Sequence, residues 1–153
     1  MTVVSTVLGL VLALAGAQAK SPAAERRQQI LDYELTMPRA TQLLTAIDAM
    51  TKYVVSLPDY AERMRKAATM TPAEQLALME KDPKSAAILK EHHLTAREYL
   101  VGVPALRMAL MVAQGVPQSD RIIASPANVT FAKAHLAELK PKLDAIDGGR
   151  GRQ

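Results

Sequence analysis

The chain contains no cysteine and no tryptophan, and it has only one phenylalanine and seven glycines in 153 residues. Without cysteine it can form no disulfide, thiolate metal site, covalent c-type haem, cysteine-linked lipid anchor or cysteine nucleophile. So few aromatic rings argue against binding single-stranded nucleic acid by base stacking. Between residues 20 and 147 the only glycines are Gly102 and Gly115, so this region has no glycine-rich loop to hold phosphates.

The residues that are present favour helix. Hydrophobic residues make up 49% of the chain and charged residues 22%, as in an ordinary globular protein, and the length suits one domain. Ala, Leu and Met, all good helix formers, dominate the apolar set. The net charge is +4, of which Arg150 and Arg152 supply two charges in a glycine-rich tail. The remainder is too small to predict a nucleic-acid partner.

The first residues predict export. Residues 3–15 carry no charge, and residues 17–19 (Ala-Gln-Ala) match the pattern before a signal-peptidase site. We therefore expect a signal peptide over 1–19, although no Lys or Arg precedes the apolar stretch. The alternative is an uncleaved membrane anchor, since residues 3–19 just reach the length of about 17 residues that a span requires. The expected location is the periplasm or the medium, or the membrane with the domain facing the periplasm.

Helix-start signals recur along the rest of the chain. Thr71 and Thr95 are each followed three residues later by Glu, which predicts two capping boxes. Ser-Pro, Asp-Pro and similar pairs mark further starts, and no stretch shows the alternation of a strand. We expect an all-α domain over 20–147, a compact bundle of about five to seven helices, followed by a flexible basic tail over 148–153. The expected helices span 22–34, 37–56, 58–68, 72–81, 83–93, 96–114 and 126–146.

Residues 99–113 carry a single charge, Arg107, so this helix is apolar nearly all round. Such a helix is buried, either centrally in the bundle or at an oligomer interface. Pro104, beside Gly102, removes a hydrogen bond to the carbonyl of Leu100 and predicts a kink. Pro141 predicts a kink or a break in the last helix for the same reason.

Arg107 is the first candidate for a functional residue. A guanidinium on an apolar helix needs a carboxylate partner, an outward path to water, or an anionic ligand. A kink at Pro104 would open a pocket near Arg107 and Tyr99, and Tyr33 is the third candidate for such a site. The carboxylates considered as partners are Asp32, Glu34 and Asp48.

The other chemistry-bearing residues are dispersed. His92 and His93 are adjacent and project about 100° apart on a helix, so they cannot share a metal ion. His135 and a methionine could ligate haem or copper, but methionine is more often a core filler. No nucleophile elbow, zinc-binding or Ser-Lys motif is present. We therefore expect no catalytic activity and no cofactor.

Two resemblances follow from these motifs. Residues 94–100 (LTAREYL), the apolar helix after them and residues 125–129 (SPANV) resemble a group of small exported all-helical bacterial proteins of unknown function. Residues 94–97 also resemble the L-T-x-x-Q motif of periplasmic stress proteins, which are helical chaperones, although Glu98 replaces the Gln. At residues 70–74 (MTPAE) Met replaces the Leu and Glu again replaces the Gln. Helix capping alone also produces such sequences.

The sequence thus predicts a non-enzymatic exported bundle that binds a protein or a small ligand. The alternatives are a periplasmic chaperone or stress-response protein, and a haem or metal carrier. Contact with a membrane is expected only if the N-terminal segment is retained, and an oligomer would form through residues 99–113.

Overall fold

The computed structural model of the chain describes residues 21–149. Within them it has seven α-helices and no strand, which confirms the all-α class. The expected signal segment (1–19) and the end of the expected tail (150–153) lie outside the described residues. The helices are α1 (Pro22–Asp32), α2 (Met37–Val55), α3 (Tyr60–Thr69), α4 (Pro72–Lys81), α5 (Pro83–Glu91), α6 (Ala96–Ala113) and α7 (Pro126–Gly149).

Local capping sets where the helices begin. Thr71 and Thr95 form the two predicted capping boxes, in which the threonine side chain and the glutamate three residues later each bind the other's backbone N–H. The remaining caps are single side chains that accept a backbone N–H three residues on, and they belong to Ser21, Thr36, Asp82 and Ser125.

The predicted end of α5 at residue 93 is wrong by two residues. His93 adopts a left-handed conformation (φ 55°), which ends the helix before it. The N–H of Leu94 donates to the carbonyl of Leu89 (2.9 Å) and that of His93 to the carbonyl of Lys90 (3.1 Å). This is the Schellman arrangement, and α6 ends in the same way at Gly115, whose φ is 94°.

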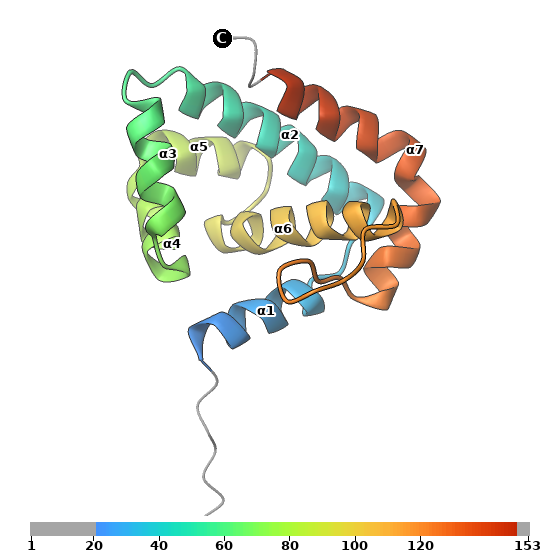
Figure 1. Cartoon of the computed structure of the whole chain (residues 1–153). Helices are drawn as coiled ribbons and strands as arrows, with labels where there is room; N and C mark the ends of the chain where they lie inside the picture. The colour runs from blue at the N-terminus through green and yellow to red at the C-terminus, as the bar shows by residue number, and fades with distance from the viewer. Residues whose placement is uncertain (1–20, 150–153) are drawn as a thin grey trace, which may run out of the picture.

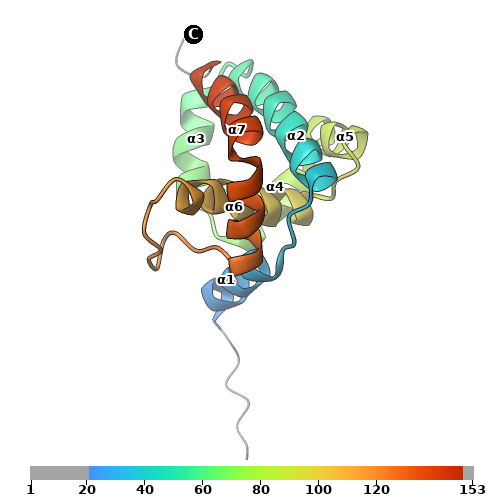
Figure 2. The same ribbon diagram turned by 90° about the vertical axis from the view of Figure 1, so that its right-hand side faces the viewer.

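Helix α6 is the centre of the molecule. It packs against α1, α2, α4, α5 and α7, so the prediction of a central buried helix is confirmed. Figure 1 shows α2 and α1 on opposite sides of α6, and Figure 2 shows α7 crossing α6. The core is aliphatic. Its most deeply buried large apolar side chains are Leu43, Ile47, Leu89, Leu106, Leu110 and Leu139.

Neither of the two helix-internal prolines breaks its helix. Pro104 lies inside a continuous α6, and the carbonyl of Leu100 that it leaves without a helical partner accepts a hydrogen bond from Arg26 (3.4 Å). Pro141 does not split the last helix: α7 is one helix that bends part-way along its length (Figure 1). Helix α7 runs to Gly149 and so includes Gly148 and Gly149, which the sequence assigned to the tail.

The segment between α1 and α2 is fastened to α7 by Asn128. This side chain is 2% exposed. Its amide oxygen accepts the N–H of Leu35 (2.9 Å), and its amide nitrogen donates to the carbonyl of Tyr33 (2.6 Å). Asn128 thus satisfies two backbone groups of a segment that belongs to neither helix.

Within residues 21–149, no helix combines the length and the apolar character that crossing a bilayer demands.

Candidate ligand-binding cavity

A cavity of about 470 Å³ lies between the C-terminal end of α2 and the helices α3 and α4. Figure 1 shows α3 and α4 at the end of the molecule opposite the bend of α7. Neither α3 nor α4 contains a buried residue, although both carry apolar side chains on the face toward α2. These two helices therefore line a cavity and do not pack tightly into the core. A volume of this size is in the range of about 300–1,000 Å³ found for small-molecule sites.

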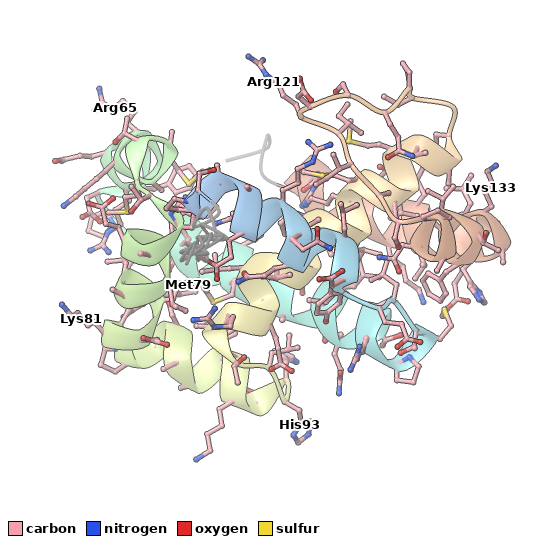
Figure 3. The ribbon with its side chains drawn as sticks, turned by 90° about the horizontal axis from the view of Figure 1, so that it is seen from below. Arg65, Met79, Lys81, His93, Arg121 and Lys133 are labelled. Atoms are coloured by element: carbon pink, nitrogen blue, oxygen red, sulfur yellow. The ribbon has the colours of Figure 1, made fainter. Side chains whose placement is uncertain are left out.

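The lining is mainly apolar and mixes methionine with tyrosine. Four of the chain's eight methionines and three of its four tyrosines line the cavity. Methionine is unbranched and polarisable, so a wall made of it can adapt to ligands of different shape. Met79 lies toward the interior in Figure 3, whereas Arg65 and Lys81 extend outward. The methionines and tyrosines of the lining are Met50, Met64, Met70, Met79, Tyr53, Tyr60 and Tyr99.

The exposed residues of the lining form the mouth of the cavity, and they are both apolar and charged. Met64 and Leu78 are apolar, whereas Asp59, Glu62, Arg63 and Lys66 are charged. The described part of the chain exposes only three large hydrophobic side chains, and two of them, Met64 (47% exposed) and Leu78 (45% exposed), line this cavity.

A polar cluster joins one side of the lining. The hydroxyl of Tyr53 donates to Asp82 (3.2 Å), and Arg63 donates to Asp59 (2.7 Å) one helical turn away. Partial burial works to raise the pKa of Asp82, but hydrogen bonds from Ser85 and Tyr53 outweigh it and hold that pKa below its usual value. Burial, together with the bond to Asp82, raises the pKa of Tyr53. At neutral pH the cluster therefore holds an ionised Asp82 and a protonated Tyr53.

A second polar network braces the wall from outside. Arg26 of α1 donates to the side chain of Gln75 (3.4 Å) as well as to the carbonyl of Leu100. Gln75 in turn donates to the carbonyls of Ala67 (3.3 Å) and Met70 (3.5 Å), both of which belong to the cavity wall. Because Pro104 has no N–H, the sequence indicated that the carbonyl of Leu100 needed another hydrogen-bond donor. Nothing in the sequence identified Arg26 as that donor.

Arg107 forms an internal ion pair. Its two terminal nitrogens donate to both carboxylate oxygens of Asp147 (2.7 and 2.9 Å), a bidentate geometry. The hydrogen bond from Asp147 raises the pKa of Arg107, against the opposing effect of burial.

None of the three carboxylates suggested for Arg107 pairs with it. Asp48 instead binds Lys52 (2.7 Å), and Asp32 accepts a hydrogen bond from Gln28 (2.8 Å). Helix α7 brings Asp147 against α6 from a position forty residues further along the chain, a tertiary contact that no local spacing announces.

The three predicted site residues are not gathered in one place. Tyr99 lines the cavity and interacts electrostatically with Arg107, but neither Arg107 nor Tyr33 lines the cavity. The ring of Tyr33 packs on Gly102 of α6, and the guanidinium of Arg39 lies 5.6 Å from the centre of that ring. Burial raises the pKa of Tyr33. Of the three, only Tyr99 therefore belongs to the candidate site, and most of its lining was not singled out from the sequence.

The histidines are dispersed. His92 and His93 directly follow the last residue of α5, and His93 points away from the molecule in Figure 3. The ring of His135 packs against Phe131 on α7, with 4.7 Å between the ring centroids. No group of three potential metal ligands occurs among residues 21–149.

Comparison with protein-family models, curated proteins and solved structures finds no match to the chain.

Proposed function

We propose that this chain is an exported, non-enzymatic binding protein whose cavity between α2, α3 and α4 holds a small apolar molecule. The observation that carries the proposal is the cavity itself. It is of ligand size and its lining is mainly apolar. The exposed part of that lining includes Met64 and Leu78, two of the three exposed large hydrophobic side chains of the described helices. Displacing water from such a surface is the main source of affinity for an apolar ligand.

Local hydrogen bonds hold the walls of the cavity in position. Thr71 caps α4 and Asp82 caps α5, whereas α3 has no side-chain cap. Gln75 holds the corner between α3 and α4 through the carbonyls of Ala67 and Met70. A preformed cavity needs little reorganisation on binding, which lowers the free-energy cost of binding.

The proposal is tested with the neutral dye N-phenylnaphthylamine, whose fluorescence rises in apolar surroundings. Ala67 lines the cavity and the neighbouring Ala68 is exposed and does not, so Ala67→Phe and Ala68→Phe form a matched pair on one helix. We expect the native chain and Ala68→Phe to bind the dye, and Ala67→Phe to bind it about tenfold more weakly. No binding to the native chain, or equal binding to both variants, would contradict the proposal.

A chaperone is the second candidate, because Met64 and Leu78 expose apolar surface at the mouth. A chaperone would suppress heat aggregation of an unrelated client protein, and Met64→Glu would reduce that suppression. If Ala67→Phe abolishes dye binding but leaves suppression intact, the exposed mouth is the functional surface and the small-molecule proposal is the weaker one.

A further inference from the structure

The charges around the cavity distinguish it from the rest of the chain. Its lining includes three carboxylates (Asp59, Glu62, Asp82) and two cations (Arg63, Lys66), a net charge of −1. The whole chain, by contrast, has a net charge of +4. The site therefore differs in sign from the protein that contains it, and complementary charge is what selects one ligand among molecules of equal apolar surface.

The two cations are poorly placed to receive an anionic head group. Arg63 already donates to Asp59 at 2.7 Å, so an anion would have to displace that carboxylate. Lys66 is exposed and lies one turn after Glu62 on α3, the order in which a glutamate and a lysine on a helix attract each other. An anion at either position would compete with a carboxylate of the chain.

Asp82, by contrast, can receive a cation without losing its partners. It accepts hydrogen bonds from the hydroxyl of Tyr53, the side chain and backbone N–H of Ser85 and the backbone of Lys84. Arg63 interacts with Asp82 electrostatically, but no cation of the described chain forms a salt bridge with it. The rings of Tyr53, Tyr60 and Tyr99 line the same cavity. Tyrosine rings attract organic cations, including quaternary ammonium groups, through their negative faces.

We propose that the ligand of this cavity is an amphipathic organic cation, with its apolar body among the methionines and its amine or quaternary ammonium group beside Asp82 and Tyr53. This inference rests on the proposed function and narrows it to one chemical class. The charge does not create the site, since the apolar cavity does that. The charge decides which amphiphile the site prefers.

The test uses three probes with the same alkyl chain and different head groups: decyltrimethylammonium, decyl maltoside and decanoate, each below its micelle concentration. The affinity of each probe is measured by its displacement of N-phenylnaphthylamine from the full-length protein. We expect the cation to bind about tenfold more tightly than decanoate, with the neutral probe between them, and added salt to narrow that preference.

Two variants assign the preference to one carboxylate. Asp82→Asn removes the charge but keeps a side chain that caps α5, and Asp144→Asn removes a charge from α7, which does not line the cavity. We expect Asp82→Asn to weaken binding of decyltrimethylammonium about fivefold more than it weakens binding of decyl maltoside. Asp144→Asn should change neither.

Equal affinity for the three probes, tighter binding of decanoate, or no effect of Asp82→Asn would overturn this inference while leaving the apolar site in place. Failure of the dye to bind at all would overturn the proposed function first. The two results are therefore distinguishable in one set of titrations.

Discussion

Replacing Asn128 by leucine should destabilise the fold more than any change on the exposed face of α7. The amide is buried and serves two backbone groups, the N–H of Leu35 and the carbonyl of Tyr33. Leucine has nearly the same size but neither donor nor acceptor, so both groups would stay buried without a partner. Each orphaned group costs about 1–3 kcal/mol, which gives a loss of about 2–6 kcal/mol. Domains of this kind have only about 5–15 kcal/mol of stability in total.

The assay is equilibrium unfolding in urea followed by circular dichroism at the helical band. Thr130→Leu is the matched control, because Thr130 is exposed on the same helix and bonds only the carbonyl of Pro126. We expect the control to change the free energy of unfolding by less than about 0.5 kcal/mol. A loss below about 1 kcal/mol in Asn128→Leu would refute the reasoning that this amide fastens residues 33–36 to α7.

Asn128→Asp adds a pH dependence with a definite sign. An ionised carboxylate could still accept from Leu35 but would face the carbonyl of Tyr33, whereas the protonated acid could donate to that carbonyl. Burial can raise a carboxyl pKa by several units, more than the start of α7 can lower it. The folded pKa then exceeds the unfolded value of about 3.9. The variant should approach native stability below that value and lose stability as the pH rises through its folded pKa.

Further predictions concern single positions. Gly102→Ala should destabilise by about 1–3 kcal/mol in urea unfolding, although alanine favours a helix, because the new Cβ would lie 2.8 Å from the ring of Tyr33; a gain in stability would contradict that contact. His93→Gly should stabilise by about 1 kcal/mol, since it relieves a left-handed residue, and an unchanged midpoint would count against this. Hydrogen bonds from Thr95 hold the pKa of Glu98 below its usual value. They therefore stabilise the fold when the pH is above that usual pKa, and this stabilisation is lost as the pH falls through the pKa of Glu98 in the folded state. Acid unfolding of Glu98→Gln, compared with that of the native chain, checks this prediction, because the variant should lack the pH-dependent stabilisation that Glu98 supplies. Expression in an exporting bacterium should yield a mass lacking residues 1–19, whereas an intact chain in the membrane fraction would indicate a retained anchor.

The helices could be predicted from sequence because their ends are local. The capping boxes at Thr71 and Thr95 need only four consecutive residues each, and the glycine that ends α6 is followed by a proline two residues later. His93 shows the limit of this approach. Nothing in its identity marks it as left-handed as clearly as a glycine would, so the predicted helix was two residues too long.

The site was much harder to predict, because it depends on contacts between distant parts of the chain. Arg107 was correctly recognised as a charge needing a partner, but Asp147 becomes its neighbour only when α7 packs on α6. The cavity exists because α3 and α4 do not pack into the core, and a helix that borders a hollow has the same apolar spacing as one that fills it. The clustering of tyrosines and methionines there follows from that packing.

The methionines themselves allow the most direct test of the central claim. In a chain labelled at the methionine methyl carbons, Met50, Met64, Met70 and Met79 report from the cavity wall, whereas Met37, Met108 and Met111 lie elsewhere and serve as internal controls. Titration with decyltrimethylammonium, followed by two-dimensional NMR, should shift the four cavity signals and leave the three controls in place. Shifts confined to the controls, or spread evenly over the cavity signals and the controls, would show that the cavity between α2, α3 and α4 is not the binding site.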